Sequence, residues 1–196
     1  GLGDVYKRQT MNNTNPFIYS DDNKRYHTLN YYNKSSFNSK VFKAVIDAGF
    51  TCPNKDGTKG TGGCIYCMGG SGYFTEKSDG EIYDSVKRQL AAEKERIYKK
   101  HPDSLITAYF QANTNTYAPV ATLKEAYTAA LDFGVHGISI GTRADCLPDD
   151  VIALLCDINS KTHLTVELGL QTIHDKSAQI INRCYTCLLY TSDAAD

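Results

Sequence analysis

The sequence feature that most constrains the fold is an alternation of strand-like and helix-like segments, repeated four times between residues 41 and 183. Short apolar, β-prone runs predict strands at residues 41–50, 105–113, from 135 onward and 164–172. Amphipathic runs predict helices at residues 81–100, 123–133, 148–158 and from 174 onward. Strands that alternate with helices in this way are typical of a parallel sheet with right-handed crossover connections.

Local signals mark two of the helix boundaries. Thr122 and Glu125 match a capping box, which predicts that the helix over residues 123–133 begins just after Thr122. Gly134 is expected to end this helix. Pro148 and Asp149 predict the start of the next helix.

Composition limits the classes of protein that fit. A chain of 196 residues is long enough for one domain with a sizeable core. The formal net charge of −1 predicts no strong nonspecific attraction to nucleic acid, and no apolar run is long enough to cross a membrane. The odd count of seven cysteines favours reduced thiols, and therefore a cytoplasmic location, over a disulfide framework.

Three of the cysteines lie in one loop. Eleven residues separate Cys52 from Cys64, and two separate Cys64 from Cys67. Thiolates are preferred ligands of zinc and of iron–sulfur clusters, and glycines in the loop allow widely spaced thiolates to turn toward one centre. Three thiolates are one short of the four that hold an ordinary ferredoxin cluster, so a cubane bound here would keep one iron free.

Polar residues gather at or near the ends of the other predicted strands. Ligands of parallel α/β folds bind at the carboxyl ends of strands, so these residues are candidates for a site. Glu167 and Gln171 lie in an otherwise apolar run, where a polar side chain needs a partner. That partner is neighbouring backbone, Arg143 or a polar cofactor. The candidates are Gln111, Asn113, Arg143, Glu167 and Gln171.

The amino-acid sequence of the cysteine loop is similar to that of a known family. The segment DAGFTCPNKDGTKGTGGCIYC resembles the cluster loop of radical S-adenosylmethionine (SAM) enzymes. More narrowly, it is similar to a bacterial family related to the radical SAM domain of the Elongator catalytic subunit. The resemblance runs from about Lys40 to Arg183 and includes the QANTNTYAP, GTRAD and VELGLQT stretches. It implies the first four units of a partial (β/α)6 TIM-like barrel, although a doubly wound sheet has the same sequence pattern.

The resemblance also implies a chemistry. Cys52, Cys64 and Cys67 would hold a [4Fe–4S] cluster whose open iron binds SAM. Reduction of that cluster would cleave SAM into methionine and a 5′-deoxyadenosyl radical, which abstracts hydrogen from a substrate. The implied cofactor-binding residues are Tyr66, which matches the aromatic residue before the third cysteine, together with Gln111, Asn113, Arg143, Glu167 and Gln171.

One departure from the superfamily pattern bears on these contacts. Many radical SAM enzymes hold the methionyl amino group with a GGE sequence at the end of the second strand, and this chain has QANTN there. The amino group would therefore be bound by an amide oxygen of Gln111 or Asn113.

The implied partners are an electron donor such as flavodoxin or ferredoxin and, through kinship with Elongator, an RNA substrate.

Two other functions fit parts of the sequence. One is a structural zinc- or iron–sulfur-binding protein without SAM chemistry, and a zinc site would need a fourth ligand. The other is an RNA-binding module, suggested by the aromatic and basic residues of 12–39. Cys146 is expected to be a buried structural thiol, and His136 and His163 are expected at the opposite end of the strands from the cluster.

Four regions are therefore expected. Residues 1–10 and 187–196 resemble translated sequencing adaptor, and we expect the natural protein to extend beyond residue 186. Residues 11–39 form an N-terminal extension, and residues 40–186 form the radical SAM core.

Overall fold

The computed structural model describes residues 24–67 and 78–187, and the chain divides into two compact units, residues 1–41 and 42–196. In the first unit, helix α1 spans Leu29–Phe37. Thr28 caps it, because its hydroxyl accepts a hydrogen bond from the backbone N–H of Tyr31 at 3.0 Å. The expectations for residues 1–10, for residues 11–23 of the N-terminal extension and for residues 188–196 concern residues outside the described ranges.

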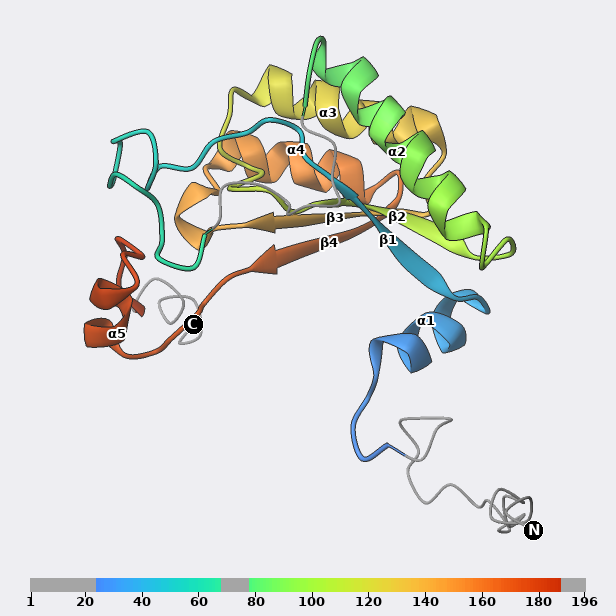
Figure 1. Cartoon of the computed structure of the whole chain (residues 1–196), viewed down its shortest axis with the longest axis horizontal. Coiled ribbons are helices and arrows are strands. Elements are labelled where there is room, and N and C mark those ends of the chain that lie inside the picture. The colour runs from blue at the N-terminus through green and yellow to red at the C-terminus, as the bar shows by residue number, and fades with distance from the viewer. Residues whose placement is uncertain (1–23, 68–77, 188–196) are drawn as a thin grey trace, which may run out of the picture. The chain divides into compact units, whose positions relative to one another are not determined.

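A four-stranded parallel sheet forms the centre of the second unit (Figure 1). The strands stand in the order in which they occur in the sequence, and their register aligns Tyr109 with Ser139 and Gly141 with Glu167. The strands are β1 (Val41–Ile46), β2 (Leu105–Phe110), β3 (Gly137–Thr142) and β4 (His163–Leu168).

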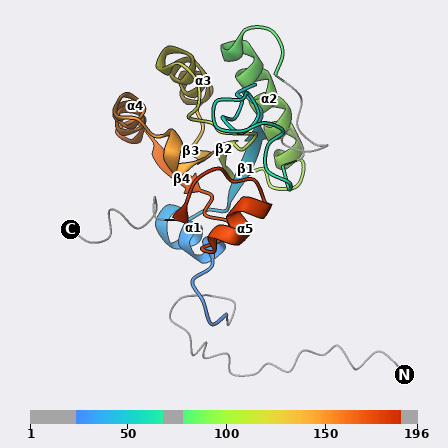
Figure 2. The same cartoon turned by 90° about the vertical axis from the view of Figure 1, so that its left-hand side faces the viewer.

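Helices connect the strands and cover one face of the sheet (Figure 2). A single-turn 3-10 helix, η1 (Ala144–Cys146), follows β3, and the short helix α5 lies beyond the carboxyl end of β4. The α-helices of the second unit are α2 (Ile82–Tyr98), α3 (Val120–Phe133), α4 (Asp149–Asn159) and α5 (Asp175–Ile180). The predicted alternation of strands and helices is thus confirmed as an α/β fold.

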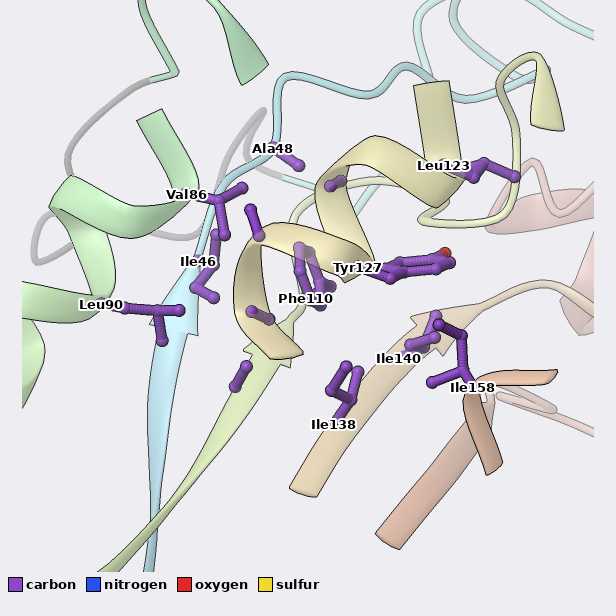
Figure 3. Close-up of a cluster of buried hydrophobic side chains, with 14 of the residues drawn as sticks. Ile46, Ala48, Val86, Leu90, Phe110, Leu123, Tyr127, Ile138, Ile140 and Ile158 are labelled. Carbon is purple, nitrogen blue, oxygen red and sulfur yellow. The ribbon is translucent and has the colours of Figure 1, made fainter. Parts of the chain in front are cut away.

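The hydrophobic core lies between the sheet and its helices (Figure 3). Along β2 every second residue is buried, as the period of two in a strand requires. Phe110 from β2 meets Tyr127 of α3 edge to face, with ring centroids 5.2 Å apart. The labelled core residues are Ile46, Ala48, Val86, Leu90, Phe110, Leu123, Tyr127, Ile138, Ile140 and Ile158.

Several sequence predictions were wrong at element boundaries. The first strand ends at Ile46 and not at residue 50, and the second ends at Phe110 and not at residue 113. The capping box does not form, because α3 begins at Val120 with Pro119 as its N-cap, and Thr122 lies inside the first turn. Proline has a preset φ and no N–H to leave unpaired, which explains why the helix starts there. Gln171 is not part of a strand, since β4 ends at Leu168 and Gln171 has a left-handed φ of 65°.

Other boundaries follow the sequence signals. Gly134 ends α3 with a left-handed φ of 83°, and α4 begins at Asp149 directly after Pro148. His136 and His163 stand at the amino-terminal ends of β3 and β4, as predicted. Within the described ranges, no helix combines the length and the apolar character that crossing a bilayer demands.

Candidate functional site

A cavity of about 610 Å³ lies at the carboxyl ends of the strands, where a parallel sheet is expected to bind its ligands. In Figure 1 the cysteine loop and α5 lie at this end of the sheet, beyond the arrowheads of β3 and β4. Every site residue predicted from the sequence borders this one cavity: Cys52, Cys64, Tyr66, Cys67, Gln111, Asn113, Arg143, Glu167 and Gln171.

The three cysteines come to the cavity on one loop after β1. All three carry free thiols; Cys52 is buried, whereas Cys64 and Cys67 are partly exposed. A tight turn joins the last two, since the N–H of Cys67 donates to the carbonyl of Cys64 at 2.8 Å. Tyr66 lies between them, and burial together with the neighbouring Cys64 raises the pKa of its hydroxyl.

An ion pair follows β3. Arg143 donates from Nε and Nη2 to the two carboxylate oxygens of Asp145, both at 2.8 Å, and Lys59 of the cysteine loop binds the same carboxylate. Burial would raise the pKa of Asp145, but these hydrogen bonds lower it, so the carboxylate is charged at neutral pH. The pair therefore ties the cysteine loop to the end of β3. Asp145 lies in the GTRAD stretch that follows the third predicted strand, but it was not among the predicted cofactor-binding residues.

Glu167 belongs to a polar layer across the sheet. Its carboxylate accepts from Ser139 Oγ at 2.7 Å, from the Tyr109 hydroxyl at 3.0 Å and from Lys43 Nζ. Its partners are thus side chains of the other three strands and not Arg143, which was one of the partners considered. Burial and the bond to Glu167 raise the pKa of Tyr109 to about 12, so its hydroxyl stays protonated.

The two candidates after β2 differ in how they are bonded. Asn113 accepts from Lys55 Nζ at 2.5 Å and donates to the carbonyl of Phe50 at 2.8 Å, so its amide holds the start of the cysteine loop. Gln111 is exposed to the cavity, and its side chain makes no hydrogen bond within residues 24–67 and 78–187. The geometry favours Gln111 as the residue with a free amide for a ligand.

Arg183 is a cavity residue that the sequence analysis missed. It is 1% exposed, and its Nη1 donates to the carbonyls of Leu170 at 2.7 Å and Thr172 at 2.6 Å. Its Nη2 is buried and has no hydrogen-bond partner in the described part of the chain. A buried guanidinium N–H without a partner is costly, and it would be satisfied by an anionic group in the cavity.

A second cavity, of about 850 Å³, lies beside the first between the cysteine loop and the starts of α3 and α4. Cys146 borders this second cavity, not the one that the three cysteines share. Burial raises the pKa of its thiol to about 11, so it is protonated at neutral pH. Cys146 is buried, as the sequence predicted.

Zinc ions and iron–sulfur cubanes place different demands on the spacing of their thiolate ligands. Among the described residues, no three His, Cys, Asp or Glu side chains are close enough together to hold a metal ion. A single tetrahedral zinc ion binds sulfur at about 2.3 Å, so its thiolates must touch one another. A cubane is a larger body that takes one thiolate on each iron, so its ligands stand farther apart. The three thiols around this cavity are the donors that a metal centre here would use.

Comparison with known proteins finds relatives but no family model that matches the chain. The chain is 49% identical over 177 residues to the uncharacterized protein YtqA of Bacillus subtilis, a match that covers 89% of this chain and 54% of the relative. It is 38% identical over 156 residues to protein YhcC of Escherichia coli, covering 79% of this chain and 48% of the relative. An uncharacterized protein of Methanocaldococcus jannaschii, MJ0486, is 35% identical over 159 residues, covering 78% and 46%. The chain thus spans about half the length of the curated relatives it matches.

Proposed function

We propose that this chain is the cofactor-binding part of a radical SAM enzyme, with Cys52, Cys64 and Cys67 as the ligands of a [4Fe–4S] cluster. The observation that carries the proposal is the single cavity at the carboxyl ends of the strands, which joins three free thiols to a buried, unpartnered arginine N–H. When bound, the reduced cluster would supply the electron that splits the sulfonium of SAM. The finer fold that goes with this function is a partial (β/α)6 barrel.

The chain's own residues would bind and orient SAM. Arg183 Nη2 would donate to the methionyl carboxylate, because it is the one nitrogen of this guanidinium that has no hydrogen-bond partner in the described residues. The amide oxygen of Gln111 would accept from the methionyl ammonium group, since its side chain is not used elsewhere in the described ranges. Tyr66 lies in the turn between Cys64 and Cys67 and borders the cavity, where it would shield the sulfonium from water.

The polar layer would form the floor of the site. Glu167 is held in place by Lys43, Tyr109 and Ser139, so it offers a fixed negative charge to the ribose hydroxyls or to the substrate. Gln171 borders the cavity on the β4 side and would contribute an adaptable amide. An RNA base as substrate and a flavodoxin or ferredoxin as electron donor remain expectations from the resemblance.

Single cysteine variants test the ligand set. We expect Cys52→Ala, Cys64→Ala and Cys67→Ala each to abolish cluster loading after anaerobic reconstitution, measured as iron and sulfide per chain and by the visible absorption of the cluster. Cys156→Ala is the matched control, because Cys156 is an exposed thiol on α4. Full loading of the Cys64→Ala variant would overturn the assignment, and stoichiometric zinc in place of iron would favour a structural zinc site.

A further inference from the structure

Asn54 is a buried residue that joins the cysteine loop to the end of α5. It follows Cys52 by two residues and is 0% exposed. Its Nδ2 donates to the carbonyl of Asn182 at 2.7 Å and to that of Arg183 at 3.1 Å. The same nitrogen lies 3.5 Å from Cys64 Sγ, within the distance of an N–H···S hydrogen bond. One amide group therefore contacts a cluster-ligand candidate and the turn that carries Arg183.

A second asparagine completes this junction from the other side. Asn182 has a left-handed φ of 56°, which ends α5 and turns its side chain to the cysteine loop. Its Nδ2 donates to the carbonyls of Gly63 at 2.8 Å and Thr61 at 3.2 Å, and the N–H of Ile65 donates to the carbonyl of Ile181 at 3.2 Å. The backbone on both sides of Cys64 is thus bonded to the end of α5.

The chemistry of its neighbours fixes the orientation of the Asn54 amide. Nδ2 faces two carbonyl oxygens and a sulfur, all of which accept hydrogen bonds, whereas the reversed amide would place Oδ1 against all three. Because Nδ2 has two N–H bonds for these three acceptors, one N–H is shared between two of them. Oδ1 is buried without a hydrogen-bond partner in the described residues. Because an unpaired buried oxygen is unfavourable, a residue that only filled space here would be better apolar. The contacts of Nδ2 therefore explain the asparagine.

We infer that Asn54 is a positioning residue that donates its amide N–H to the Cys64 thiolate and thereby raises the reduction potential of the bound cluster. The inference rests on the proposed function. A hydrogen bond to a cluster thiolate offsets negative charge, and the reduced cluster carries one more negative charge than the oxidised one, so the bond stabilises the reduced form more. Burial strengthens the effect, since water does not compete for the donor. Asn182 holds the same loop but donates only to backbone carbonyls.

Two matched variants separate an effect on the reduction potential of the cluster from an effect on the position of the cysteine loop. Asn54→Ala removes the N–H···S bond and the loop contacts, whereas Asn182→Ala removes loop contacts and a contact with Cys184 Sγ but no side-chain contact with Cys64. The reduction potential of the reconstituted cluster would be measured by redox titration monitored by electron paramagnetic resonance, without substrate. We expect Asn54→Ala to shift the reduction equilibrium about tenfold toward the oxidised cluster, which is about 59 mV for a one-electron couple. Asn182→Ala should leave the potential near that of the unmodified chain.

An unchanged potential in Asn54→Ala, or an equal shift in both variants, would overturn the inference. If Asn54→Ala does not load a cluster, the inference is tested instead on the unmodified chain, labelled with nitrogen-15 only in asparagine. Pulsed electron paramagnetic resonance of its reduced cluster should show a nitrogen-15 coupling that survives in Asn113→Ala, and no such coupling would also overturn the inference. An unmodified chain that binds zinc and no cluster would instead overturn the proposed function.

Discussion

The two faces of the sheet carry opposite chemistry on the same strands. On the face that α2, α3 and α4 cover, β2 presents the fully buried Phe110, whereas its neighbour Tyr109 points to the other face and bonds Glu167. Alternation of polar and apolar residues is more typical of antiparallel sheets, in which one face is usually in water. Here the polar side chains bond one another across the strands and border a cavity. The comparison shows that the apolar face forms the core of this fold, whereas the polar face borders a cavity.

The largest effect should come from truncating the apolar face. Phe110→Ala removes a ring that is fully buried against Tyr127, so we expect the free energy of unfolding to fall by about 3–5 kcal/mol. Urea denaturation followed by circular dichroism would measure it. Tyr109→Phe, at the adjacent position on the polar face, is the matched control and should cost under about 1.5 kcal/mol. Equal losses from the two variants would break the comparison.

Breaking the buried ion pair should have the next largest effect. Asp145→Ala leaves Arg143 without its bidentate partner, and both side chains are at most 10% exposed. We expect a loss of about 3 kcal/mol in the free energy of unfolding. The exposed pair of Lys161 and Asp157 on α4 provides a control, since Asp157→Ala should change stability by about 0–1 kcal/mol. A loss below about 1 kcal/mol for Asp145→Ala would show that the pair does not hold the loop.

A smaller and more specific effect is expected at Gln111. Gln111→Leu should weaken SAM binding to the cluster-loaded chain about tenfold, or about 1.4 kcal/mol, without lowering the free energy of unfolding. Isothermal titration calorimetry would give the affinity. Asn113→Ala should instead lower stability, because the Asn113 amide bonds Lys55 and the Phe50 carbonyl. Unchanged affinity in Gln111→Leu would remove this residue from the site.

The smallest effect is a dependence on pH. Burial alone would raise the pKa of Glu167, but hydrogen bonds from Lys43, Ser139 and Tyr109 lower it below the ordinary value of 4.5. A lowered carboxyl pKa stabilises the folded state fully above the unfolded value, and this contribution is lost as the pH falls through the folded value. We expect Glu167→Gln to cost up to about 1 kcal/mol at pH 7 and nothing well below pH 4.5. A difference that persists or grows in acid would contradict this account.

The sequence predicted the local features of the molecule well. The spacing of apolar residues within a segment indicates which of its faces is buried, so the strands and helices could be located from the sequence. The polar residues at the carboxyl ends of the strands could be located in the same way. Pro119 shows the limit even for local signals, since it starts α3 where the Thr122–Glu125 pattern favoured a later start. Asn113 and Gln111 are close in sequence and alike in chemistry, yet only the structure shows that one amide is already used.

Contacts between distant segments could not be predicted in the same way. Asn54 bonds backbone carbonyls more than a hundred residues away, and no periodicity encodes such a pairing. In the sequence, Arg183 is a charged residue near the end of a predicted helix, and nothing marks it as buried. Its burial and its unpartnered Nη2 arise from the way the chain folds back over the cavity. The partner of Glu167 was also ambiguous, because three other strands supply the donors.

The central claim is that the cavity holds a cluster with an iron open to SAM. Its most direct test is electron paramagnetic resonance of the anaerobically reconstituted, dithionite-reduced chain, with and without SAM. The account predicts a [4Fe–4S]⁺ signal whose g values change when SAM is added, because SAM binds the iron that no cysteine holds. A cluster signal that SAM leaves unchanged, or a chain that takes up zinc and no iron, would contradict it.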